Sequence, residues 1–114
     1  MFNLFKKKEV KTQDPDEMVL SHLIKAGSNI TKPHTIDFFL YFTTQEDAEK
    51  AKVVLQKEGR IIEIKTTQPP YITCQIVIEM KPNLQILQNI RQEFQQIAKQ
   101  YNGMYDGWGT EIEE

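Results

Sequence analysis

The chain has 114 residues, a formal net charge of −2 and a pI near 5.7, a length that allows one domain with one hydrophobic core. Its hydrophobic content of 39% and charged content of 26% are ordinary for globular proteins, so the composition predicts a folded chain. The acidic balance argues against a phosphate-binding surface, the single cysteine excludes an internal disulfide, and no apolar run is long enough to span a bilayer, so we expect a cytoplasmic protein.

The first 13 residues predict a flexible basic tail. Lys6, Lys7, Lys8 and Lys11 stand there against Glu9, and the segment has no regular apolar pattern. The apolar tip MFNLF before three lysines leaves a weak membrane-surface tether as the alternative. We therefore place one folded domain at residues 14–114.

A short helix is expected to begin at Asp14. The sequence Asp-Pro-Asp-Glu supplies an N-cap, a proline at the first helical position and acidic residues in the first turn. Apolar residues follow at helical spacing until Gly27, which favours a helix end. The next segment, SNITKPH, is typical of a loop, and we expect both His22 and His34 to be surface or half-packed imidazoles.

The segment IDFFLYF predicts a strand with two apolar faces. Its more apolar face carries Ile36, Phe38, Leu40 and Phe42. Phe39 and Tyr41 lie on the other face, which should be at least partly covered. Thr43 or Thr44 then has capping-box spacing ahead of a second helix, which we expect Gly59 to end.

The second half of the domain alternates strands and a helix. RIIEIKT and YITCQIVIEM each have the period of two expected for strands, and the TQPP between them predicts a turn. Pro82 and Asn83 open the longest helix, which has a Gln-rich solvated face and ends at Asn102 and Gly103. A last short strand is expected over residues 104–108.

This order of elements predicts an α+β protein with a ferredoxin-like βαββαβ sandwich and an extra N-terminal helix. Two helices should cover one face of an antiparallel sheet. The open sheet face, with Phe39, Tyr41 and Tyr71, would then be covered by the first helix or by a partner.

No convergent set of groups indicates an enzyme, a metal site or a cofactor site. Cys74 lies in the middle of an apolar strand face, where burial disfavours the thiolate. The two histidines lack metal-ligand spacing, and Gly107 and Gly109 do not form a phosphate-binding loop. An RNA-binding module that stacks bases on the open sheet face remains the alternative to a protein-binding regulator.

The sequence QYNGMYDGWGTEIE after the long helix resembles the C-terminal signature of the regulator of ribonuclease E activity B family. The resemblance is densest at YDGWGTE. It extends more loosely to Ile36, Asp37, Leu40 and the run Gln45-Glu46-Asp47, and covers about residues 14–112. It implies a bacterial, non-enzymatic regulator of ferredoxin-like fold that binds ribonuclease E, or another RNA-processing enzyme, and lowers RNA cleavage.

The signature also supplies the candidate docking residues, which are Tyr105, Asp106, Gly107, Trp108, Gly109 and Glu111. The two glycines predict a β-bulge or a close backbone approach that lets the Trp108 ring pack. Asp106 could hydrogen-bond the loop backbone. Together with the C-terminal glutamates Glu111, Glu113 and Glu114, it is expected to form an unbalanced acidic edge that steers a protein partner.

Overall fold

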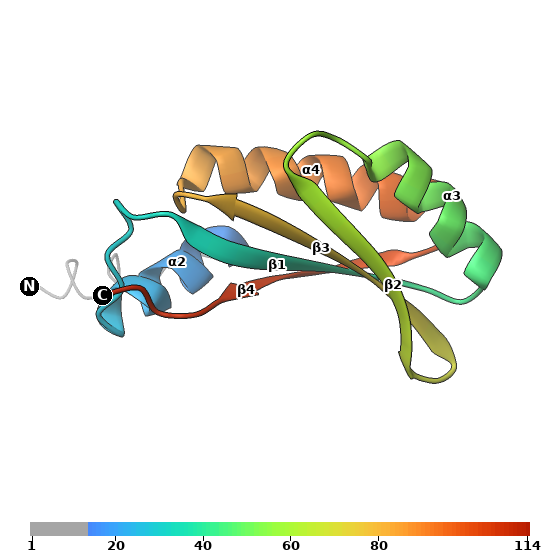
Figure 1. The fold of residues 1–114 in the computed structure, drawn as a ribbon, viewed down its shortest axis with the longest axis horizontal. Helices are drawn as coiled ribbons and strands as arrows, with labels where there is room; N and C mark the ends of the chain where they lie inside the picture. Colours follow the sequence, from blue (N-terminus) through green and yellow to red (C-terminus); the bar gives the residue numbers. More distant parts are fainter. Residues whose placement is uncertain (1–13) are drawn as a thin grey trace, which may run out of the picture.

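The computed structural model describes residues 14–114, arranged as three helices and a four-stranded antiparallel sheet (Figure 1). The helices are α2 (Pro15–Lys25), α3 (Gln45–Leu55) and α4 (Leu84–Gln100). The strands are β1 (His34–Phe42), β2 (Arg60–Gln68), β3 (Tyr71–Met80) and β4 (Met104–Thr110). The α+β class is confirmed, whereas the basic tail predicted at residues 1–13 lies outside the described residues.

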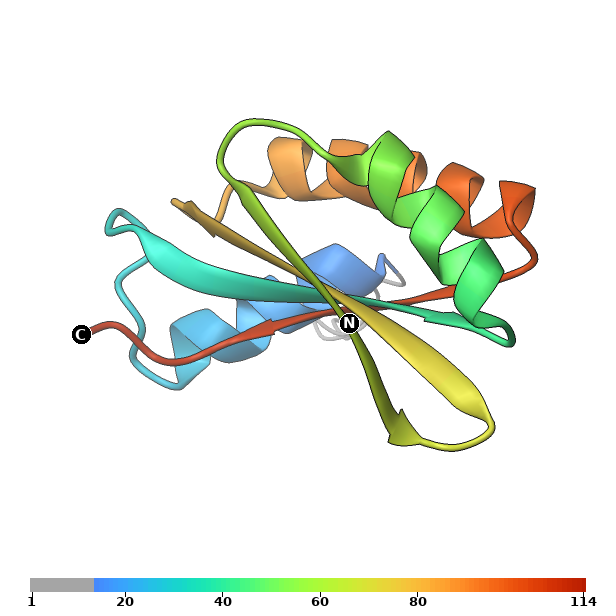
Figure 2. The ribbon, with the colours of Figure 1, turned by 45° about the vertical axis from the view of Figure 1, so that its right-hand side comes forward.

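The sheet has the order β2-β3-β1-β4, and every neighbouring pair is antiparallel. β1 pairs with β3 over its full length, from His34 opposite Met80 to Phe42 opposite Ile72. The β2–β3 hairpin projects beyond the helices at its turn (Figure 2). β2 and β4 form the two edges of the sheet.

The core lies between the sheet and the helices α3 and α4. Ile36, Phe38, Leu40 and Phe42 of β1 are all fully buried or nearly so, as their alternation predicts. They meet α4, whose Phe94 ring packs edge-on against Phe38 with ring centroids 5.5 Å apart. One face of each strand supplies this core, and residues 14–114 place no helix on the opposite face.

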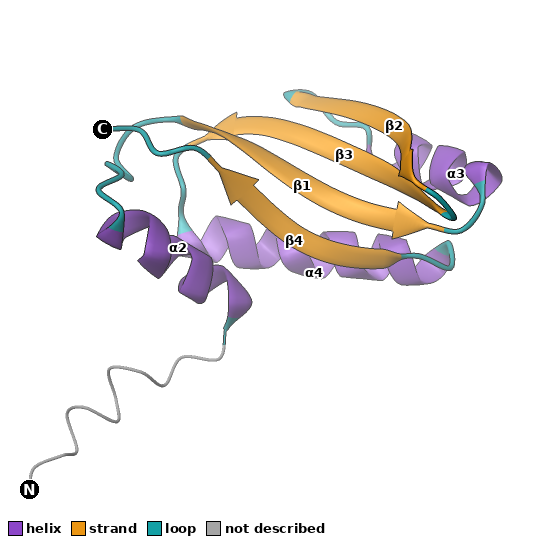
Figure 3. Cartoon of the chain, turned by 90° about the horizontal axis from the view of Figure 1, so that it is seen from below, coloured by secondary structure: helices purple, strands orange, loops and turns teal. Residues whose placement is uncertain are grey.

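Helix α2 packs on the helical side of the sheet, beside edge strand β4 and next to α4 (Figure 3). Of the two expected ways to cover the open sheet face, the first helix is therefore not the one used. The helix begins at N-cap Asp14, whose carboxylate accepts from the backbone N–H groups of Asp16 and Glu17 at 2.9 Å each.

Two sequence expectations are wrong. Helix α3 ends at Leu55, and Gly59 lies in the following turn with a φ of 87°, because the chain must reverse there before β2. His34 begins β1 and is 1% exposed, because the loop after α2 folds back and supplies a buried hydrogen-bond partner for the imidazole.

Candidate functional site

The signature residues lie on edge strand β4, which carries a β-bulge. Phe39 of β1 is opposite Gly107 and the next residue, Leu40, is opposite Tyr105, so Asp106 is the extra residue. Gly107 has a φ of 103°, a conformation that favours glycine. The bulge pushes the exposed Asp106 out of the regular ladder and turns Tyr105 and Trp108 to the same side of the sheet.

Trp108 ties β4 to helix α2. Its ring lies on the core face opposite Phe38 and is 8% exposed. The indole Nε1–H donates to Asp16 Oδ1 at 3.0 Å across 92 positions of sequence. Asp16 is only 2% exposed, and burial raises the pKa of its carboxyl.

Arg91 of α4 completes this junction between two helices and the sheet. Its guanidinium lies 3.3 Å from Asp16 Oδ2, as an ion pair without hydrogen-bond geometry, and 3.2 Å from Asp14 Oδ2. Backbone hydrogen bonding at the helix start lowers the pKa of Asp14, and Gln88 and Arg91 lower it further. Sequence reasoning missed the roles of Asp16 and Arg91. Their signals were a second aspartate two residues after the N-cap aspartate and the only arginine of the long helix.

A hollow of about 270 Å³ lies at this junction, between α2, α4 and β4. Tyr105 is one of its walls and packs edge-on against Phe94, with centroids 5.9 Å apart. The buried Tyr105 hydroxyl has no hydrogen-bond partner among residues 14–114, and burial raises its pKa. Asp16, Arg91 and Trp108 line the same hollow, but their polar groups already contact one another.

The open sheet face carries a second hollow, of about 250 Å³, lined by Tyr41, Tyr71, Met104 and Asp106. Tyr41 is opposite Met104, and Tyr71 and Met104 are exposed by 47% and 56%. Burial, and then the charge and hydrogen bonding of Asp106, raise the pKa of Tyr41. Phe39 lies apart from this hollow, opposite the bare Gly107.

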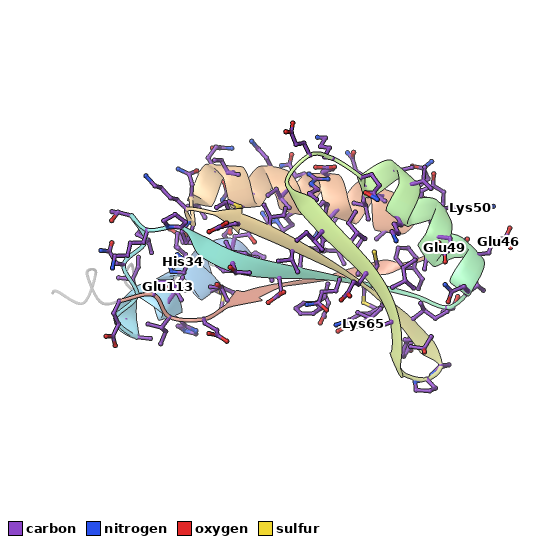
Figure 4. The ribbon with its side chains drawn as sticks, viewed as in Figure 1. His34, Glu46, Glu49, Lys50, Lys65 and Glu113 are labelled. Atoms are coloured by element: carbon purple, nitrogen blue, oxygen red, sulfur yellow. The ribbon has the colours of Figure 1, made fainter. Side chains whose placement is uncertain are left out.

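A polar chain crosses the centre of the open sheet face. Lys65 Nζ donates to Gln75 Oε1 at 2.7 Å, and Gln75 Nε2 donates to Asp37 Oδ1 at 2.9 Å. Lys65 also lies 3.4 Å from Glu63, and it projects from β2 in Figure 4. The charge of Lys65 is thus engaged within its own face.

The C-terminal glutamates do not form one acidic edge with Asp106. Asp106 lies in the bulge near the start of β4, whereas Glu111 follows the other end of the strand. Glu113 is held by the loop after α2, because its backbone N–H donates to Ser28 Oγ at 2.9 Å and its carbonyl accepts from Asn29 N–H at 2.6 Å. Successive residues of an extended strand are about 3.3 Å apart, so Asp106 and the C-terminal glutamates lie at opposite ends of β4.

His34 supports this C-terminal attachment. Its Nδ1 lies 2.8 Å from the Lys32 carbonyl oxygen and therefore donates, which leaves Nε2 to accept from the Ser28 hydroxyl at 2.7 Å. Figure 4 shows His34 and Glu113 near each other at this end of the sheet. The buried histidine thus has a structural partner on each ring nitrogen.

The remaining reactive groups do not assemble a reaction centre in the described part of the chain. Burial raises the pKa of the Cys74 thiol to about 11, so the nucleophilic thiolate is disfavoured. Residues 14–114 contain no group of three histidine, cysteine, aspartate or glutamate side chains placed to hold a metal ion. The same residues include no helix long and apolar enough to cross a membrane.

Comparison with known proteins agrees with the signature. The family model described as regulator of ribonuclease activity B matches residues 13–110. A protein of that name from Salmonella typhi is 26% identical over 111 residues, covering 90% of this chain and 78% of the relative. Another, from Colwellia psychrerythraea, is 28% identical over 105 residues, covering 86% of this chain and 89% of the relative. The chain therefore belongs to the regulator of ribonuclease activity B family.

Proposed function

We propose that this chain regulates ribonuclease activity as a non-enzymatic inhibitor, by docking on a ribonuclease, with ribonuclease E as the partner. The family match carries the proposal, because it covers every described helix and strand and the signature up to Thr110. The described surface supports it, since it offers two aromatic-lined hollows and exposed carboxylates instead of a nucleophile with a base. We assign this activity to the cytosol, which suits a buried, unpaired cysteine.

The proposal includes a ferredoxin-like fold for the regulator. Its support is the antiparallel order β2-β3-β1-β4, with a helix after β1 and another after β3 on one face. Helix α2 is the addition to that plan. Within residues 14–114 this arrangement places no helix on one sheet face, which we propose as the surface for a macromolecular partner.

The docking surface we propose combines the open sheet face with the bulged signature. Tyr41, Tyr71 and Met104 supply apolar contact area around the Asp106 carboxylate, and Phe39 extends it toward the centre of the sheet. Aromatic and methionine side chains are enriched in protein interfaces, whereas charges at the rim mainly set association rates. Asp106 would take part directly, and the C-terminal glutamates would act on the approaching partner from a distance.

Purified chain and purified ribonuclease E test this function together. Calorimetry should show a stoichiometric complex, and the cleavage rate of a fluorescent RNA substrate should fall as the chain is added. A ribonuclease of unrelated fold, assayed with the same substrate, should keep its rate. Protection of the RNA without any complex with the enzyme would instead favour the RNA-binding alternative.

A further inference from the structure

Gly109 is the glycine of this chain that its own fold does not require. Gly27, Gly59 and Gly107 have φ values of 98°, 87° and 103°, and a Cβ on Gly103 would lie 2.5 Å from the Phe42 ring. The backbone of Gly109 is outside the left-handed region, and a Cβ there would meet no atom of residues 14–114 within 4 Å. A glycine inside a strand without an internal reason indicates close approach by another chain or ligand.

The two glycines of β4 leave a bare strip on the open sheet face. Gly107 is opposite Phe39 and Gly109 is opposite Asp37, whereas Trp108 between them points to the core. The bare strip therefore consists of these two glycines with Phe39 and Asp37 beside them. On β4 this strip is bare backbone, because glycine has no side chain, and Phe39 of β1 is its apolar neighbour.

The charges around the bare strip are negative. Asp106 lies at one end, and Asp37 lies beside Gly109, three residues or about 10 Å further along the strand. Lys65 is the one lysine or arginine of the described strands on this face, and Glu63 and Gln75 already engage it. The described residues carry ten basic and fifteen acidic side chains, a net charge of −5. These charges favour a basic occupant and disfavour the phosphates of RNA.

The hollow at the Asp106 end suits one basic side chain. Tyr41 and Tyr71 offer aromatic faces, Met104 offers a polarizable thioether, and Asp106 supplies the counter-charge, around about 250 Å³. A guanidinium or ammonium group on an apolar stem matches both the rings and the carboxylate.

We propose that the bare strip receives an extended segment of the partner ribonuclease in which arginine or lysine alternates with apolar residues. One basic side chain enters the hollow at Asp106, a second reaches Asp37, and the backbone of the segment runs over Gly107 and Gly109. This inference rests on the proposed function, because it names the part of the ribonuclease that the regulator recognises.

Substitution at Gly109 separates docking from folding. Binding of wild type, Gly109→Ala and Gly109→Val to two probes is measured by calorimetry: purified ribonuclease E, and a synthetic peptide in which arginine alternates with valine. The dissociation constant should rise with side-chain size and reach at least about tenfold for Gly109→Val. The melting temperature should stay level or rise, because the backbone tolerates a side chain and the unfolded chain loses freedom.

Asp106→Asn tests the charge, with Glu58→Gln as its matched control. Both changes remove one negative charge from an exposed side chain, but Glu58 lies in the turn before β2, away from the strip. Asp106→Asn should weaken both probes severalfold and flatten the salt dependence, while Glu58→Gln should leave both unchanged. Equal effects of the two variants would overturn the placement of the basic side chain.

The two probes also separate this inference from the proposed function. If ribonuclease E binds wild type and Gly109→Val equally well, the strip is not the docking track, although the regulator function stands. If only the peptide binds and Gly109→Val weakens it, the strip is supported and the ribonuclease E assignment fails. Three other results would each overturn the inference. Neither probe binds, the peptide binds only after the chain's own basic residues 1–13 are removed, or the chain binds RNA tightly and loses that binding in Tyr41→Ala.

Discussion

Replacing Trp108 with alanine should destabilise the fold by about 3–5 kcal/mol, the usual loss for a buried tryptophan. The side chain is 8% exposed, so nearly all of its packing is lost, and its hydrogen bond to the Asp16 carboxylate contributes about 1.5–3 kcal/mol of that range. A domain of this size loses about 4–8 °C per kcal/mol, so the melting temperature should fall by at least about 12 °C. Far-UV circular dichroism is the assay, because the substitution removes the chain's only tryptophan fluorophore.

Trp108→Phe separates the hydrogen bond from the packing. Burial raises the pKa of Asp16 in the folded state. The contribution of this carboxyl to the free energy of unfolding is therefore complete below its unfolded pKa of about 3.9, and it is lost as the pH rises through the folded-state pKa. The indole N–H opposes that shift, and phenylalanine removes it. The variant should therefore lose about 1.5–3 kcal/mol at pH 7 and less near pH 4. A melting temperature of Trp108→Ala within about 3 °C of wild type would refute the packing role of Trp108. A pH-independent loss in Trp108→Phe would refute the role of its hydrogen bond to Asp16.

Three further predictions use other contacts. Ser28→Ala should destabilise by about 1–2 kcal/mol and speed amide exchange at Glu113, measured by NMR, because two hydrogen bonds at Ser28 Oγ are lost. Arg60 hydrogen bonding lowers the pKa of Glu93, so Glu93→Gln should reduce urea stability by about 1–2 kcal/mol at pH 7 and by less as pH falls below the unfolded pKa of about 4.3. Neutralising all three C-terminal glutamates should slow association with ribonuclease E at low salt, measured by stopped flow, without changing the melting temperature.

Local patterns predicted most of the elements, because their causes lie within a few residues. The bounds of β3 follow from Pro70 before it and Pro82 after it, since proline cannot continue the ladder. Asp14 and Asn83 cap their helices as the sequence indicates. The predicted end of α3 was wrong because Gly59 lies in a turn four residues beyond the helix. A glycine alone does not distinguish a helix end from a turn that follows it.

The candidate site depends on contacts that no local pattern contains. Asp16 and Trp108 meet across 92 positions, and only the packing of α2 beside β4 makes that contact. The acidic residues near the C-terminus looked like one cluster in the sequence, because their separation along an extended strand is invisible until the strand is placed. Tyr41 and Tyr71 were predicted on the open sheet face from alternation alone, whereas their common hollow with Asp106 required the strand order.

The bulge explains why one short strand concentrates aromatic residues and glycines. Tyr105 and Trp108 are three positions apart, and in a regular strand they would point to opposite faces. The extra residue Asp106 shifts the alternation of side chains by one position, so that both rings pack on the helical side of the sheet. Gly107 supplies the backbone conformation that the bulge needs. The same shift turns Gly107 and Gly109 to the open sheet face. A change that removed the bulge would therefore expose one ring and also place side chains where the partner is expected to approach.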